Sequence, residues 1–325
     1  MLPPIAVTIL ARDSGETIER AIRSVLPIAR QIIVLDTGSA DDTPTRALRL
    51  GAEVYFARWD NDFAAARNYA LRHVRTPWVL ALDSDEELDS TTLLAHAHLL
   101  NEPTIGGIEL QLRSTASPEE RQQLVFAHWA VRLFRYAEGV AYSGRVHEQI
   151  RPALEARRWR IVRAPILIWH FGYTPDQIRQ KAQRNAELLR RELAHCPGDA
   201  WLQYHLGMAL FELGETEQAL ELLRRCSEHP ELQPEQRYWA RLRAAQAALK
   251  LERIEDAEHL VARPVPDPEL EGLRRFVMAA VVMQQHRFAE ALQLLDSAVV
   301  RDSPFVPQER VDAFVATLRR FLPPQ

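Results

Sequence analysis

The chain has 325 residues, of which 47% are hydrophobic and 26% are charged, and its formal net charge is −4. This composition is that of a soluble globular protein long enough for two domains, and it excludes a disordered chain. The slight acidic excess argues against a general nucleic-acid binder, which would carry a surplus of basic residues.

The cysteines and the first residues bear on the compartment. Cys196 and Cys226 lie far apart and form no CxxC pair, so we expect neither a disulfide framework nor a thiolate zinc site, and a reducing cytoplasm fits best. The opening MLPPIAVTIL has no basic segment before its apolar run, which we interpret as a strand and not as a signal peptide. We therefore expect a cytoplasmic protein, with peripheral attachment to the inner membrane surface left open.

Short apolar runs alternate with longer segments through the first hundred residues. The predicted strands are 5–10, 31–35, 53–56 and 78–82, and the predicted helices are 15–26, 42–50 and 62–74. Thr43 and Asp62 are the expected N-caps, and Gly51 ends the second helix. This alternation predicts βαβ units in a parallel sheet, which binds ligands beyond the carboxyl ends of its strands. Asp36 and Asp83 end two of these runs and should lie at one rim.

The pattern changes after residue 105. Longer strands are predicted at 108–114, 125–135 and 159–169, and a helical region begins near Asp176 and continues to the end. In that region Ala219, Ala257 and Ala291 align at spacings of 38 and 34, each with a small residue 12 positions upstream. A period near 34 indicates tetratricopeptide (TPR) repeats. An irregular helical bundle is the alternative, and it predicts nearly the same packed helix pairs.

The segment Asp83-Ser84-Asp85 is the strongest chemical signal. Carboxylates directly after a buried strand are costly unless they have a partner. A divalent cation held between them and a phosphate ligand would supply one, and Mg²⁺ or Mn²⁺ suits such hard oxygen ligands. The alternative is a solvated acidic loop before the next helix, because an Asp-x-Asp pattern is unspecific and a second one occurs at 60–62.

Two further residues are candidates on position. Asp36 closes the neighbouring strand and could accept hydrogen bonds from a ribose or a base; its alternative is a simple cap in an Asp-Gly turn. Arg67 follows Asp62 by about one helical turn and could face phosphate or hold Asp83. It could equally be an ordinary surface arginine.

Four segments together resemble a family 2 glycosyltransferase: ILARDSGETIERAIRSV (9–25), IIVLDTGSADDT (32–43), WDNDFAAARN (59–68) and WVLALDSDEEL (78–88). The resemblance continues more loosely through RLFR (132–135), GRVHEQI (144–150) and WHFGY (169–173). It implies a GT-A fold, often followed by a TPR tail. We therefore expect a Rossmann-like α/β GT-A domain with a mostly parallel sheet at 1–175, and an all-α TPR-like domain at 176–325.

The resemblance also implies a reaction, namely inverting, metal-dependent transfer from a nucleotide-diphosphate sugar, with a UDP-sugar favoured. The implied nucleotide-sugar contacts are Ala11, Arg12, Glu16, Asp36, Arg67, Asp83 and Ser84. The implied metal ligands for Mn²⁺ or Mg²⁺ are Asp83, Asp85 and His170, of which Asp85 is also placed in the catalytic group. The loop Arg12–Glu16 departs from the family's usual Asn followed by acidic residues, which leaves the base selectivity open.

Inversion requires a general base on the acceptor side. Glu148 is the expected base, with His147 beside it; an ordinary polar pair at a strand end is the alternative. His170 could return to the metal and would favour Mn²⁺. Its alternative is a satisfied, partly buried histidine between two aromatic residues.

Two other functions stay open. One is a catalytically silent binding scaffold, and the other is a nucleotidyltransferase, which would release pyrophosphate in place of a nucleoside diphosphate. The expected acceptor is a glycan, lipid or protein, with the helical tail as one place to bind it. We expect no nucleic-acid partner, and a homo-oligomer is left open.

Overall fold

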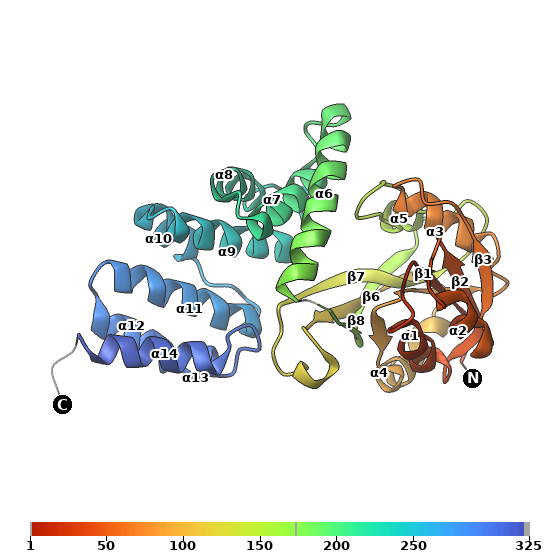
Figure 1. The fold of residues 1–325 in the computed structure, drawn as a ribbon, viewed down its shortest axis with the longest axis horizontal. Coiled ribbons are helices and arrows are strands. Elements are labelled where there is room, and N and C mark those ends of the chain that lie inside the picture. Colours follow the sequence, from red (N-terminus) through yellow and green to blue (C-terminus); the bar gives the residue numbers. More distant parts are fainter. Residues whose placement is uncertain (1, 173, 322–325) are drawn as a thin grey trace. The chain divides into compact units, whose positions relative to one another are not determined.

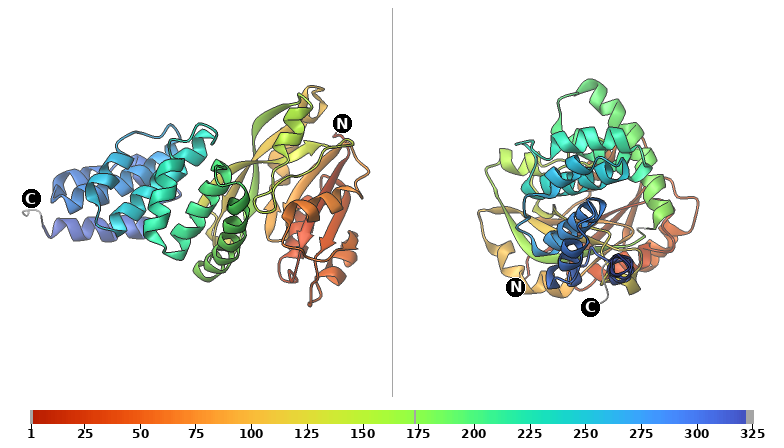
Figure 2. Two further views of the ribbon diagram at one scale, coloured as in Figure 1. Left: turned by 90° about the horizontal axis from the view of Figure 1, so that it is seen from above. Right: turned by 90° about the vertical axis from the view of Figure 1, so that its left-hand side faces the viewer.

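The computed structural model describes residues 2–172 and 174–321. The chain divides into two compact units, Met1–Pro118 with Phe126–Tyr173 and Glu119–Val125 with Thr174–Gln325. The first is an α/β unit and the second is helical (Figures 1 and 2). The expected fold class, a mostly parallel α/β sheet followed by a run of helices, is confirmed. Every helix in the described residues is too short or too polar to span a bilayer.

One sheet of eight strands forms the α/β unit, in the order β3-β2-β1-β4-β7-β6-β8-β5. The strands are β1 Ile5–Ala11, β2 Ala29–Asp36, β3 Glu53–Phe56, β4 Trp78–Asp83, β5 Glu86–Leu88, β6 Ile105–Ser114, β7 Phe126–Arg135 and β8 Arg160–His170. Six strands run in one direction, and only β7 and β5 oppose them within the described sheet. The first four form the parallel half predicted from the alternating runs.

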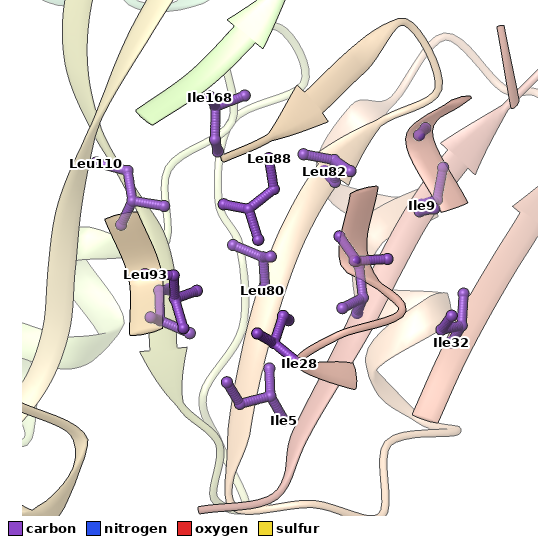
Figure 3. Close-up of a cluster of buried hydrophobic side chains, with 14 of the residues drawn as sticks. Ile5, Ile9, Ile28, Ile32, Leu80, Leu82, Leu88, Leu93, Leu110 and Ile168 are labelled. Carbon is purple, nitrogen blue, oxygen red and sulfur yellow. The ribbon is translucent and has the colours of Figure 1, made fainter. Parts of the chain in front are cut away.

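Helices cover both faces of the sheet (Figure 1). One face packs against α1 Ile18–Val25, α2 Thr43–Arg49 and α4 Ser90–Ala95, and the other against α3 Phe63–Leu71 and α5 Arg151–Ala156. Short 3₁₀ helices span Ala97–Asn101 and Pro118–Glu120. Figure 3 shows the first core, where Leu80 and Leu82 of β4 lie among Ile5, Ile9 and Leu88. Each such side chain contributes about 1.5–3 kcal/mol by burial.

Two local predictions have different outcomes. Asp62 caps α3 as expected, since its side chain accepts a hydrogen bond from the N–H of Ala65. Thr43 does not cap α2; Asp42 is the N-cap, and Thr43 is the first helical residue. The hydroxyl oxygen of Thr43 instead accepts the N–H of Ser14 at 2.7 Å, which joins the loop after β1 to the start of α2.

The helical unit begins with α6 Pro175–His195. It continues with α7 Ala200–Leu213, α8 Thr216–Cys226, α9 Pro234–Lys250, α10 Ile254–Val261, α11 Pro268–Gln284, α12 Phe288–Leu295, α13 Ala298–Arg301 and α14 Gln308–Arg319. Consecutive helices from α6 to α12 pack against one another. The aligned residues Ala219, Ala257 and Ala291 are fully buried. A Cβ added at Gly207 would lie 2.8 Å from the side chain of Leu223, so the two helices approach closely at this crossing.

Candidate active site

The carboxyl ends of β2, β1 and β4 bring the predicted residues to one rim. Ala11 at the end of β1 is in register with Asp36 of β2, and the neighbouring Leu10 is in register with Asp83 of β4. Adjacent parallel strands lie about 4.8 Å apart. The predicted meeting of Asp36 and Asp83 at the same edge is therefore found in the structure.

Asp36 is 1% exposed and is engaged by its own turn. One carboxylate oxygen accepts the N–H groups of Gly38 and Ser39, each at 2.9 Å, and the other accepts the Ser39 hydroxyl at 2.5 Å. Gly38 has φ +104°, a conformation that favours glycine. Asp36 thus holds the loop after β2, as the turn-cap alternative describes, and its contact with a base or ribose stays a prediction.

The loop after β1 carries the residues expected around the base. The carbonyl of Ala11 accepts the N–H of Thr37 at 3.0 Å. Arg12 and Glu16 are exposed at this rim. The Ser14 hydroxyl lies 2.8 Å from the hydroxyl of Ser84, so this loop is tied directly to the Asp-Ser-Asp segment.

Arg67 is the residue that joins the two sides of the site. It is 6% exposed; its Nη2 donates to Asp83 at 2.6 Å, and its Nε donates to Glu148. Burial by itself would lower the pKa of Arg67, but Asp83 and Glu148 raise it well above its usual value. The guanidinium therefore stays charged, and the surface-arginine alternative is wrong for this buried side chain.

Sequence reasoning missed Arg132 and Glu86 as neighbours of Asp83. Nη2 of Arg132 lies 3.3 Å from Asp83 and 2.8 Å from the fully buried Glu86, which also accepts the N–H of Asp83. Burial opposes ionisation of Asp83, but Arg67, Arg132 and His170 lower its pKa far below the usual range. Burial raises the pKa of Glu86. Asp83 is therefore an ionised carboxylate shared by two arginines.

A β-bulge aims Arg132 at this cluster. The register of β6 and β7 passes from Ile108 opposite Leu133 to Glu109 opposite Val131, which leaves Arg132 as the extra residue. Bulges often redirect a side chain beside an active site. The RLFR segment marked this arginine in the sequence, but only the register gives its direction.

Asp85 and His170 meet because of a strand that was not predicted. β5 pairs antiparallel with β8, so that Glu86 lies opposite His170, and the N–H of Phe171 donates to the carbonyl of Asp85. His170 Nε2 is then 3.1 Å from Asp85 Oδ2. Tyr173, at the end of the predicted segment 169–173, lies outside the described residues.

The donor set suits a divalent cation only in part. An imidazole nitrogen and a carboxylate at this distance can both turn to one ion, while Asp83 is engaged by arginines. No group of three His, Cys, Asp or Glu arranged for a metal occurs in the described residues. Asp85 and His170 could supply two ligands to a metal completed by diphosphate and water, and metal binding by Asp83, Asp85 and His170 stays a prediction.

Glu148 lies on a short loop opposite these groups. Its side chain is 13% exposed, and Arg67 binds only its Oε1. Burial raises the pKa of the nearby Tyr142 to about 12 and lowers that of His128 to about 3. Both side chains are therefore neutral near pH 7, whereas Arg67 and Arg132 bring positive charge to Glu148.

Comparison with known proteins identifies the family of the N-terminal part of the chain. Residues 6–145 match the model of the family described as glycosyl transferase family 2. A TPR repeat-containing protein of Synechococcus elongatus is 32% identical over 244 residues, which are 72% of this chain and 59% of that protein. The glycosyltransferase SunS of Bacillus subtilis is 25% identical over 69% of this chain and 53% of its own length. The chain thus spans little more than half of either relative.

Solved structures are similar over different parts of the chain. TarS of S. aureus has a TM-score of 0.42 at 14% identity and covers 88% of this chain and 55% of its own. A glucosyl-3-phosphoglycerate synthase of Mycobacterium tuberculosis, solved with Mn²⁺, UDP-glucose and glycerol 3-phosphate, has a TM-score of 0.28 at 26% identity over 35% of this chain and 44% of that chain. From the family match over residues 6–145 and the rim that these residues build, the N-terminal unit contains a glycosyltransferase family 2 domain.

Proposed function

We propose that the protein transfers a sugar from a nucleotide-diphosphate sugar to an acceptor, with inversion at the anomeric carbon. The observation that carries this proposal is the buried Arg67, which binds Asp83 on the donor side and Glu148 on the opposite side. A long-range link between two carboxylates at a strand-end rim has no evident structural need, because buried ion pairs seldom add stability.

On the donor side, the loop Arg12–Glu16 and Ser84 would contact the nucleotide, with a UDP-sugar favoured. Arg67 and Arg132 bring two guanidinium groups to Asp83. Preorganised charges of this kind stabilise a diphosphate as negative charge develops on it. Asp85 and His170 would hold Mn²⁺ or Mg²⁺, which supplies further neutralisation of the leaving diphosphate.

On the acceptor side, Glu148 would act as the general base. The acceptor oxygen forms a bond to the anomeric carbon while the bond from that carbon to the diphosphate oxygen breaks. Glu148 takes the acceptor's proton, and the nucleoside diphosphate leaves with the electron pair of the broken bond. Arg67 fixes the carboxylate through Oε1 and leaves Oε2 to face the acceptor, which would be a glycan, lipid or protein.

A thermal-shift panel tests the donor site. The wild type and Asp85→Ala are measured with UDP, GDP, dTDP and CDP, each with and without Mn²⁺. A ligand at 100 times its dissociation constant stabilises by about 2.7 kcal/mol, which moves the midpoint by a few degrees. We expect one nucleotide to stabilise the wild type only with Mn²⁺ and to lose this effect in Asp85→Ala.

The second Asp-x-Asp supplies a matched control. Asp60 is 74% exposed, and Asp60→Ala should retain the full metal-dependent shift. With the corresponding nucleotide sugar, the protein should then release nucleoside diphosphate. A nucleotidyltransferase would instead release pyrophosphate when it is given a nucleoside triphosphate and a sugar 1-phosphate. If no nucleotide shifts the wild type under any condition, the donor site is refuted and a binding scaffold becomes the better explanation.

A further inference from the structure

The side chain of Asn68 on α3 pairs with a backbone peptide far along the chain. Its Nδ2 donates to the carbonyl of Tyr142 at 2.9 Å, and its Oδ1 accepts the N–H of Tyr142 at 2.7 Å. Only this orientation of the amide satisfies both bonds, because the backbone has one donor and one acceptor here. Asn68 therefore substitutes for a neighbouring strand and fixes the backbone at residue 142.

The loop that carries Glu148 begins at the next residue. Ser143 and Gln149 close it with two backbone hydrogen bonds of 3.0 and 2.8 Å. Inside the loop, Gly144 has φ +90° and His147 has φ +55°. A non-glycine residue in this region is uncommon and persists only where the surroundings enforce it.

Helix α3 holds the same loop at two more points. The N–H of Phe63 donates to the carbonyl of Arg145 at 2.9 Å, and Arg67 binds the carboxylate of Glu148. Arg67 also binds Asp83, so one rigid element faces both the donor side and the base. Of these three contacts from α3, those of Phe63 and Arg67 reach residues within the loop. Asn68 instead holds the backbone of Tyr142, directly before the loop begins.

We propose that Asn68 is a positioning residue for Glu148. By holding the peptide of Tyr142, it sets where the Ser143–Gln149 loop starts and hence where the carboxylate of Glu148 lies relative to Arg67. This inference rests on the proposed function, since it concerns the base of that reaction. A displacement of about 1 Å at a reacting group can lower a rate by about 100-fold.

The test compares Asn68→Ala, Asn68→Asp and the control Asn101→Ala. Asp keeps the volume and the acceptor for the Tyr142 N–H but lacks the donor, whereas Ala loses both bonds. Asn101 is an exposed residue at the end of a 3₁₀ helix of the same unit. The readouts are metal-dependent nucleotide binding, backbone hydrogen exchange over residues 142–149, and the rate of nucleoside diphosphate release from the nucleotide sugar.

We expect Asn68→Ala to bind nucleotide within about threefold of the wild type, to exchange faster over 142–149, and to lose about 10- to 100-fold in kcat with little change in the donor KM. Asn68→Asp should be intermediate, and Asn101→Ala should match the wild type. Unchanged exchange and kcat in Asn68→Ala would overturn the inference. If that variant does not fold, Asn68→Asp decides by the same measurements. A wild type that neither binds nor turns over the donor would refute the proposed function instead, while the exchange data still test the link from Asn68 to the loop.

Discussion

Each unit has a buried cluster of charged side chains, and the two clusters differ in how many hydrogen bonds the central glutamate accepts. In the helical unit, Glu271 is 12% exposed and accepts four hydrogen bonds, from Arg274, Arg275 and the N–H of Val265. At the rim of the α/β unit, Glu148 is 13% exposed, yet only one of its oxygens is bonded within the described residues. The two carboxylates are therefore equally buried, but both oxygens of Glu271 accept hydrogen bonds, whereas only one oxygen of Glu148 does.

Sequence separation explains the difference. The arginines that bind Glu271 follow it by three and four residues, so one helix provides three of the four hydrogen bonds, and Val265, just before that helix, donates the fourth. Arg67 and Glu148 are 81 residues apart, and Arg132 and Glu86 are 46 apart. A local cluster whose carboxylate oxygens all accept hydrogen bonds stabilises a helix. A cluster built from distant residues, with a carboxylate oxygen that accepts no hydrogen bond, is suited to binding a ligand.

The largest expected effect is on turnover by Glu148→Gln. The amide keeps the size of the side chain and a contact to Arg67 but cannot take a proton, and loss of a general base lowers rates by about 10²–10⁴-fold. Nucleotide binding by thermal shift should be retained. Glu155→Gln is the control, because Glu155 is an exposed partner of Arg151. Full activity in Glu148→Gln would show that Glu148 is not the general base.

The matching substitution in the helical unit, Glu271→Gln, should lower the stability of the protein and leave nucleotide binding unchanged. Glu271→Gln leaves the buried Arg274 without its counter-charge, which typically costs about 3–5 kcal/mol of unfolding free energy. Chemical denaturation followed by circular dichroism measures this loss, with nucleotide binding as the second readout. Glu290→Gln, which removes only an exposed pair with Arg287, should cost less than about 0.5 kcal/mol. A Glu271→Gln protein as stable as that control would contradict the comparison.

Acid should weaken the helical unit through the same residue. Burial opposes ionisation, but hydrogen bonds from Arg274, the Val265 N–H and Arg275 lower the pKa of Glu271 to about 2. The folded form thus stays ionised where the unfolded chain takes up a proton, so this stability is complete above about pH 4.5 and is lost as the pH falls towards 2. The loss should be about 3 kcal/mol. Denaturation curves at several pH values should show it in the wild type and much less of it in Glu271→Gln.

The smallest expected effect is at a helix crossing. In Gly207→Ala the new Cβ would meet Leu223 at 2.8 Å, and the overpacking outweighs the better helix propensity of alanine by about 1 kcal/mol. Gly198→Ala is the control, because nothing lies within 4 Å of a Cβ there. A stabilised Gly207→Ala would show that the crossing adapts and that the small residue is not required.

Much of the fold follows from local pattern. The first four strands and the helices between them were predicted with errors of a few residues at their ends, because apolar periodicity and caps such as Asp62 act over short distances. The helix pairs were found from the spacing of Ala219, Ala257 and Ala291 for the same reason. The short strand β5 and helix α5 were missed, since a few residues carry too little periodic signal.

In the site, too, the local features were predicted from the sequence and the long-range contacts were not. The sequence by itself determined that Asp36 and Asp83 end parallel strands at one rim, because βαβ units place the carboxyl ends of their strands at the same edge of the sheet. The strand order, in which β1 separates β2 from β4, came from the structure. Only the tertiary structure decided that β5 returns His170 to Asp85 and that a bulge aims Arg132 at Glu86. These contacts depend on register and side-chain direction between distant segments, where a shift of one residue turns a side chain to the opposite face of the sheet.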